Sequence, residues 1–228
     1  MSASSGTEPT QPAGGDASVH PGRFPRGTLE FDRAAFFSDA VFAIALTILV
    51  VGIAVPKVSD ARLAHEIGRL EPQIISFFIG FAVIGYYWLA QHRFFKHLDA
   101  IDQGFLAVLL AYLASIAFVP FPTALIGEHG GAPIAVVIYA ITISAASLLE
   151  TMLLVRAYRS KLFRNDVSRS VFRFALLTSL IPVAVFLVSI PICYADTTLA
   201  MLSWLLVLVV EKVIVRWRPP ESAAELDI

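Results

Sequence analysis

The sequence predicts an all-α integral membrane protein with six transmembrane helices, and two observations carry this prediction. The 228-residue chain is 57% hydrophobic, has a mean hydropathy of +0.74, and contains only 15% charged residues. Charged residues make up about a quarter of a typical soluble protein. The apolar residues also gather into six runs that each reach the about 20 residues needed for a helix to cross a bilayer.

The six runs follow one another with short polar connections. They cover residues 35–55, 73–92, 103–122, 133–155, 171–192 and 196–215. The third run ends in Val-Pro-Phe-Pro, and we expect these two prolines to stop the helix. Pro182 lies inside the fifth run, where we expect a kink. The polar connection from Ser59 to Gln73 carries an apolar stripe and predicts a short additional helix before the second run.

The two ends of the chain differ from its apolar body. Residues 1–28 are rich in Ser, Gly, Pro and Ala and contain no apolar signal-peptide core, so we expect a disordered cytoplasmic tail. Residues 29–216 then form the six-helix domain. Residues 217–228 are predicted to be a second, short cytoplasmic tail.

The basic residues predict the orientation of the helices. Of the 17 Lys and Arg residues, 14 fall in the segments 23–33, 93–96, 156–173 and 212–218, which lie on one side of the predicted membrane. Cytoplasmic loops of membrane proteins carry this excess of positive charge, so both termini are predicted to be cytoplasmic in a multi-pass plasma-membrane protein. The basic connection 156–173 is explained by this rule, although a site for lipid head groups is an alternative.

Several classes of function find no support in the sequence. There is no metalloprotease, nucleophile-elbow or phosphate-loop motif, and His92 and His97 are spaced wrongly for a metal pair on one helix face. One cysteine excludes an internal disulfide, and a net charge of −1 gives no reason to expect nucleic acid as a partner. Glu150 and Arg156 are interpreted as residues that snorkel at a helix end. We therefore expect no enzyme, cofactor or metal, and favour a channel or transporter.

The segment before the first apolar run carries charges that need an explanation. In one interpretation Ser38 is an N-cap and the helix begins at Asp39. In the other the helix begins near Arg33, and Asp39 needs a partner at the membrane interface. Trp88 and His92 are candidate partners, because they lie one turn apart at the end of the neighbouring second run. The residues alone leave both interpretations open.

The apolar part of the first run has a stripe of β-branched residues. At 100° per residue, Ile44, Ile48, Val51 and Val55 fall within about 60° of one another on a helical wheel. Thr47 borders this stripe. Most such stripes face lipid or another helix, but stiff apolar side chains can also form a hydrophobic constriction in a pore.

The segment "RAAFFSD" resembles a known signature. Arg33, Phe37, Ser38 and Asp39 match the R-x-x-x-F-S-D motif that opens the first helix of the transmembrane protein 175 family, the endosomal and lysosomal potassium channels and their bacterial homologues. The small-residue start, the Ile/Leu-rich run and the closing proline that follow are also similar. The resemblance covers residues 30 to 216 in overall layout, and it identifies the chain with the single-repeat bacterial type.

The resemblance implies a pore built from the first helices of four subunits, and hence a homotetramer. By their positions after the motif aspartate, Ile44, Ile48 and Val51 would form the constriction, and Thr47 would supply a polar layer in the pore wall. Potassium ions and membrane lipid would be the partners. The implied function is a passive, potassium-permeable cation channel without a carbonyl selectivity filter.

The resemblance also implies a structural role for the polar residues of the motif. Arg33, Ser38 and Asp39 would hold the helix ends together with Trp88 and His92 of the second helix. The residues alone leave two alternative functions open. One is a secondary transporter or proton-coupled carrier, and the other is a non-conducting structural membrane subunit.

Overall fold

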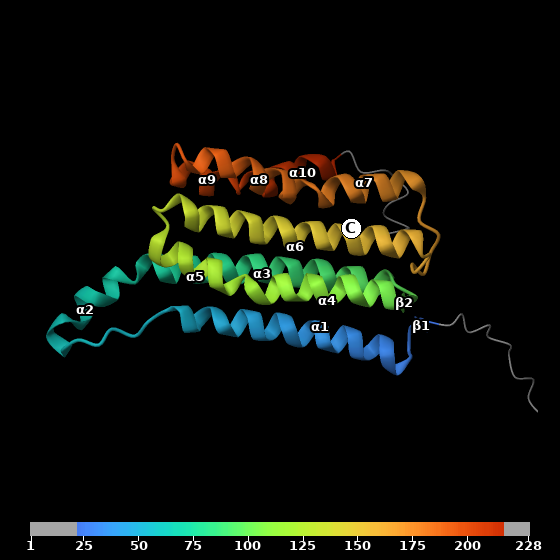
Figure 1. Ribbon diagram of the computed structural model, residues 1–228, viewed down its shortest axis with the longest axis horizontal. Coiled ribbons are helices and arrows are strands. Elements are labelled where there is room, and N and C mark those ends of the chain that lie inside the picture. Colours follow the sequence, from blue (N-terminus) through green and yellow to red (C-terminus); the bar gives the residue numbers. More distant parts are fainter. Residues whose placement is uncertain (1–21, 217–228) are drawn as a thin grey trace, which may run out of the picture.

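The computed structural model describes residues 22–216 (Figure 1), so most of the two predicted tails, residues 1–21 and 217–228, lies outside the described residues. In chain order the elements are β1 (Arg23–Pro25), α1 (Leu29–Ile48), the 3₁₀ helix η1 (Leu49–Gly52), α2 (Asp60–Arg69), α3 (Glu71–His97), β2 (Ala100–Asp102), α4 (Gln103–Phe118), α5 (Pro120–His129), α6 (Pro133–Arg159), α7 (Arg169–Ser179), α8 (Ile181–Cys193), α9 (Thr197–Ser203) and α10 (Leu206–Val215).

Six helical segments within residues 22–216 are long and apolar enough to cross a membrane, as predicted. They are Leu29–Gly52, Glu71–His97, Gln103–His129, Pro133–Arg159, Arg169–Cys193 and Thr197–Ile214. The predicted short helix in the first connection is also present as α2. Figure 1 shows α2 projecting away from the bundle of spans.

The third span differs from its prediction, because the two prolines do not end it. Pro120 and Pro122 lie in the first turn of α5, where a proline needs no backbone N–H donor. The helical bonding pattern resumes at once, since the Thr123 N–H donates to the Val119 carbonyl at 3.1 Å. The prolines therefore interrupt the span at Val119, and the span continues to His129.

The fifth span is interrupted where a kink was predicted. The helix α7 ends at Ser179, α8 begins at Ile181, and Pro182 lies in the first turn of α8. Pro191 lies in the interior of α8. The third, fifth and sixth spans are therefore each built from two shorter α-helices, the sixth from α9 and α10.

The helix α6 lies at the centre of the bundle. Figure 1 shows it between α3, α4 and α5 on one side and α7 to α10 on the other, while α1 lies at the outer edge. Its sequence is rich in small residues, and Ala140, Ala146 and Ser147 are fully buried. Such residues let membrane helices approach closely.

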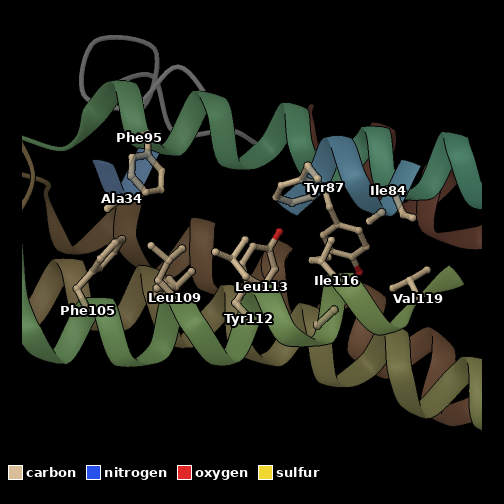
Figure 2. Close-up of a cluster of buried hydrophobic side chains, with 14 of the residues drawn as sticks. Ala34, Ile84, Tyr87, Phe95, Phe105, Leu109, Tyr112, Leu113, Ile116 and Val119 are labelled. Carbon is tan, nitrogen blue, oxygen red and sulfur yellow. The ribbon is translucent and has the colours of Figure 1, made fainter. Parts of the chain in front are cut away.

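The main buried cluster, which also includes Ala140 and Ala146 of α6, fills the space between α1, α3 and α4 (Figure 2). The ring of Tyr112 packs against the rings of Phe42 and Tyr87, at centroid distances of 6.2 Å and 6.5 Å. Ala34 and Phe95 belong to the same cluster and join α1 to the end of α3. These contacts bury one face of α1 against the rest of the subunit and fix its rotation about its own axis.

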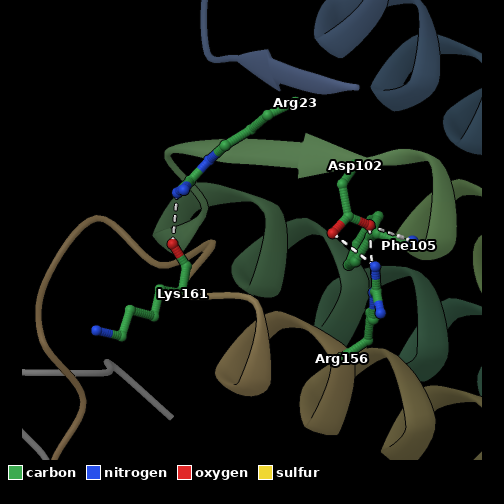
Figure 3. A network of polar contacts seen from close by, with 5 residues as sticks. All are labelled: Arg23, Asp102, Phe105, Arg156 and Lys161. Carbon is green, nitrogen blue, oxygen red and sulfur yellow. Dashed lines mark hydrogen bonds and ion pairs between the residues drawn. The ribbon is translucent and has the colours of Figure 1, made fainter. Parts of the chain in front are cut away.

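A short ribbon ties the beginning of the chain to two later connections. β1 pairs antiparallel with β2, with Arg23 opposite Asp102. Arg23 also donates to the Lys161 carbonyl at 2.5 Å (Figure 3), and Leu98 is bridged to Phe163. Residues 22–28, predicted as part of a disordered tail, are thus ordered in the structure, because their backbone is hydrogen-bonded to residues far along the chain.

An ion pair closes the same end of the bundle. Nε and Nη2 of the Arg156 guanidinium donate to the two carboxylate oxygens of Asp102, at 3.2 Å and 2.9 Å (Figure 3). Burial alone would raise the pKa of Asp102, but the hydrogen bond from the Phe105 N–H and the contact with Arg156 outweigh burial, so this pKa lies below its usual value. Arg156, predicted to snorkel, is therefore held by a partner.

Candidate functional site

The candidate site is α1 together with η1, and this segment has one covered and one uncovered face. Phe42, Ala45 and Leu49 are buried against the other helices of the subunit. On the opposite face Ile44, Thr47, Ile48 and Val51 are exposed. In a membrane protein, such an uncovered apolar face meets lipid or another subunit.

Ser38 decides between the two interpretations of the start of the helix. α1 begins at Leu29, so Ser38 lies well inside the helix and is not an N-cap. Its buried hydroxyl donates to the Ala34 carbonyl one turn earlier, at 2.8 Å. A serine in a helix interior commonly satisfies its hydroxyl in this way. The interpretation with the helix starting before Arg33 is the one that the structure supports.

Asp39 has the partner that the second interpretation required. The indole nitrogen of Trp88 donates to the Asp39 carboxylate at 2.9 Å, which connects α3 to α1. The ring of His92 stacks on Trp88 at a centroid distance of 5.6 Å and an angle of 26°. Trp88 is thus fixed on one side by the stack and on its edge by the hydrogen bond. The structure brings Asp39, Trp88 and His92 together as predicted.

Arg33 and Phe37, the other residues of the motif, do not join this group. Both side chains are exposed on α1. Within residues 22–216, Arg33 forms no hydrogen bond or ion pair. The polar residues of the motif are therefore divided between an internal contact, made by Ser38 and Asp39, and an outward-facing group.

The β-branched stripe lies on the uncovered face of the helix. Ile44 is 56% exposed, Ile48 is 49% exposed and Val51 is 77% exposed. Residues Leu49–Gly52 form a 3₁₀ helix, in which residues three apart lie directly above one another, so Val51 lies in line with Ile48. Val55, which the helical wheel placed in the stripe, lies beyond the end of the helix because the chain leaves helical geometry after Gly52.

Thr47 lies on the same exposed face as the stripe. Its hydroxyl donates to the Ile44 carbonyl at 2.9 Å, within the same helix. This bond uses the only hydrogen of the hydroxyl and directs its oxygen lone pairs away from the helix axis. Thr47 therefore presents an acceptor, as a cation ligand must.

Sequence reasoning missed the contact that supports the far end of the stripe. Leu49 packs against Gly80 of α3, and a Cβ built on Gly80 would lie 3.1 Å from the Leu49 side chain. Thr123 of α5 closes the same gap. A single glycine inside an apolar span is the signal that could have indicated this close approach.

The described part of the chain holds no group of three or more His, Cys, Asp or Glu residues that could bind a metal ion. The chemistry available on α1 is therefore that of a helix surface with three apolar side chains and one hydroxyl acceptor in a row.

Known proteins resemble this chain in sequence and in fold. Residues 33–120 match the family described as "Endosomal/lysosomal potassium channel TMEM175". The chain is 37% identical over 101 residues to a potassium channel of Streptomyces collinus, covering 44% of this chain and 49% of that protein. It is 38% identical over 117 residues to a potassium channel of Chamaesiphon minutus, covering 49% of this chain and 58% of that protein.

The fold agrees over a greater length. The crystal structure of a lysosomal potassium-selective channel TMEM175 homolog from Chamaesiphon minutus matches with a TM-score of 0.70 and 27% identity, over 82% of this chain and 98% of that one. The chain is therefore similar to the TMEM175 family over residues 33–120 in sequence and over most of its length in fold.

Other TMEM175 proteins extend the comparison. A crystallised variant of the potassium channel MtTMEM175 matches with a TM-score of 0.60 and 21% identity, over 87% of this chain and 97% of that one, which shows the shared fold. The endosomal/lysosomal proton channel TMEM175 of Rattus norvegicus is 29% identical over 166 residues, 66% of this chain and 28% of that protein. In sequence, the chain spans about half the length of the bacterial relatives it matches. It is a multi-pass membrane protein.

Proposed function

We propose that this protein is a passive, potassium-permeable cation channel. The observation that carries the proposal is the uncovered face of α1, where Ile44, Thr47, Ile48 and Val51 lie in a row inside a chain similar to the TMEM175 family. Two bacterial relatives are named potassium channels, which supports potassium as the permeant ion. The proposal assigns the protein no catalytic role.

The pore requires more than one subunit. A single α1 offers only one wall, and its exposed stripe cannot enclose an ion path within one copy of the chain. We place four copies around a common axis, with the α1 helices lining the pore as a homotetramer. Ile44 then forms the narrowest ring, backed by rings of Ile48 and Val51. Stiff apolar rings of this kind control ion flow by excluding water.

Thr47 supplies the polar element of the proposed pore. Four Thr47 hydroxyls, with their lone pairs directed away from each helix, would form a ring of oxygen acceptors between the rings of Ile44 and Ile48. The sequence contains no T-V-G-Y-G filter, whose backbone carbonyls replace the hydration shell of potassium. Selectivity for potassium over sodium is therefore modest in this proposal.

The contact between Asp39 and Trp88 acts as a structural anchor in the proposed channel. It joins α1 to α3 near the middle of α1, about 7 Å along the helix axis from Ile44. Asp39 is engaged with Trp88 and thus serves to position α1, while permeating ions meet Ile44 and Thr47. The His92 stack belongs to the same anchor, whereas Ser38 is bonded within α1.

The orientation of the channel follows from its basic residues. The ribbon places residues 22–28, 98–102 and 161–163 at one end of the bundle, and these segments adjoin the basic connections. We place this end and both termini in the cytoplasm, with the protein in the plasma membrane.

The test is a potassium flux assay on purified protein in liposomes, run beside a mass measurement of the assembled protein in detergent. We expect a tetramer, and potassium flux that rises when Ile44→Asn wets the constriction. Leu208→Asn is the matched control, because Leu208 is equally exposed on α10, at the opposite edge of the subunit from α1 (Figure 1). A monomer without flux, or equal flux in both variants, contradicts the proposal.

A secondary transporter is the second candidate, and the interrupted spans are the observation that favours it. The breaks at Val119 and at Leu180 each divide a span near its middle, and transporters often bind substrates at such breaks. Saturable uptake driven by an ion gradient would support a transporter, whereas current that is linear in voltage supports the channel.

A further inference from the structure

A cavity of about 390 Å³ lies away from α1, on the other side of α3. Its walls come from α3, α4, α6, α7 and α8, together with Phe163 of the basic connection. Cavities of about 300–1,000 Å³ are the usual size of small-molecule sites in proteins. None of the residues proposed to line the pore contributes to this cavity, so the inference below stands independently of the proposed function.

Glu150 lines the cavity at an unusual depth. It lies nine residues before the end of α6 at Arg159, which is about 13 Å along the helix axis. A glutamate side chain is too short to reach the end of the helix over this distance, so the interpretation of Glu150 as a snorkelling residue is wrong. An ionisable residue at this depth in a membrane protein marks a functional site unless shown otherwise.

Two other residues on the cavity wall, both in the described structure, each have a buried polar atom that forms no hydrogen bond. The side-chain oxygen of Gln91 on α3 and the hydroxyl of Tyr112 on α4 form no hydrogen bond, although Gln91 is 6% exposed and Tyr112 is 0% exposed. A buried polar group without a partner costs about 1–3 kcal/mol. Both residues line the cavity, so a molecule in the cavity could supply the missing bonds.

The chemistry of these groups selects the kind of molecule. The Gln91 oxygen is only an acceptor, the Glu150 carboxylate is an acceptor, and the Tyr112 hydroxyl can accept. Three acceptors around one space suit a ligand group with several N–H donors and a positive charge, and a primary ammonium has both. Tyr87, Phe94 and Phe174 supply aromatic walls, which favour cations and apolar bodies alike.

Arg93 and His97 also line the cavity and lie one turn apart near the end of α3. Arg93 is exposed, so water and salt screen its charge. An inorganic anion would gain from Arg93 but would meet the acceptors Gln91 and Glu150 on the inner wall. The geometry points to a binding site for a small organic molecule with a primary ammonium group and an aromatic or aliphatic body.

The test is isothermal titration of the full-length protein in detergent with 2-phenylethylammonium. The neutral probe 2-phenylethanol has the same shape without the charge. We expect saturable binding of the ammonium only, weakened about tenfold or more by Glu150→Gln, because a charge-assisted hydrogen bond is lost. Glu128→Gln is the matched control, since Glu128 is an exposed carboxylate at the end of α5 and leaves binding unchanged.

A second variant keeps the test decisive if Glu150→Gln does not fold. Ala175 of α7 is buried and lines the cavity, so Ala175→Leu should fill the space and abolish binding. Binding that is unaffected by both variants overturns the proposal, as does equal binding of the neutral probe. Absence of binding to the unmodified protein also overturns it and indicates a cavity that holds only water. This test measures the heat of binding and not ion flux. A negative result is therefore distinguishable from a failure of the channel proposal.

Discussion

The contact of Gly80 with α5 and η1 gives the sharpest test of the packing. An ideal Cβ on Gly80 would lie 2.6 Å from the Thr123 methyl carbon and 3.1 Å from the Leu49 side chain. Carbon atoms are in optimal contact at about 3.5–4.0 Å. Gly80→Ala therefore requires α3 to move away from α5 and η1 by about 1 Å, and both neighbouring side chains are buried.

The magnitude follows from a comparison with a second glycine of the same helix. Gly85 lies five residues further along α3, and a Cβ there meets no atom within 4 Å. Each Gly→Ala change stabilises the helix by the same amount, about 0.5–1 kcal/mol, through the higher helix propensity of alanine. The difference between the two variants isolates the overpacking at Gly80, which we expect to cost about 1–3 kcal/mol of unfolding free energy.

The assay is unfolding of the purified protein in mixed micelles, followed by tryptophan fluorescence, for the wild type and both variants. Thr123→Ser removes the methyl carbon and keeps the hydroxyl that donates to the Val119 carbonyl. Added to Gly80→Ala, it should restore most of the lost stability. Equal stability of Gly80→Ala and Gly85→Ala would refute the reasoning, because the close approach of α3 to η1 would then be absent.

Three further predictions address the site and the end of the bundle. In a double-mutant cycle of Asp39→Ala and Trp88→Phe, the effects on the free energy of unfolding should be non-additive by about 1 kcal/mol, because each change removes the same partly exposed hydrogen bond. Additive effects would show that this bond contributes nothing to stability. Asp39→Ala should reduce the tetramer fraction on size exclusion more than it changes the potassium-to-sodium permeability ratio, and the opposite result would make Asp39 a permeation residue. Asp102 has a pKa below its usual value of 3.8, so it stabilises the fold above that pH and loses this contribution as the pH falls through the lowered pKa. Asp102→Asn should therefore flatten the fall in melting temperature below pH 3.8. A melting temperature with the same pH dependence in variant and wild type would contradict the role of the Arg156 pair.

The sequence was sufficient for the number and order of the spans, because burial in a bilayer imposes a length and a composition that can be counted. Helical spacing and antiparallel neighbours made Trp88 and His92 candidate partners of Asp39, but the residues alone left the alternative of an N-cap at Ser38 open, and only the resemblance favoured the pairing. The wheel for the first helix failed at Val55, because it assumed one helical geometry throughout. The change to a 3₁₀ helix at Leu49 depends on contacts with α3 and α5, which a single run does not record.

Other features could not be predicted for a related reason. The effect of Pro120 and Pro122 depends on whether the helix can restart after them, and packing of α5 against α3 and α6 allows it to do so. The ribbon of β1 and β2 joins two three-residue segments about 75 residues apart, too short for any periodic pattern to reveal. The cavity is assembled from five helices, so Glu150 was judged only by its distance along its own helix.

The ribbon has a mechanical consequence for α1. The Arg26 N–H is bonded to the Asp99 carbonyl at 2.6 Å, three residues before α1 begins, so this end of the helix moves with the ends of α3 and α4. At its other end η1 leads into residues 53–59, which have no helical structure. The Asp39–Trp88 bond and the packing of Leu49 against Gly80 also hold α1 against α3 further along its length. A small rotation imposed on the connection that carries Lys161 and Phe163 would therefore be transmitted through Arg23 and Leu98, and α1 would move together with α3.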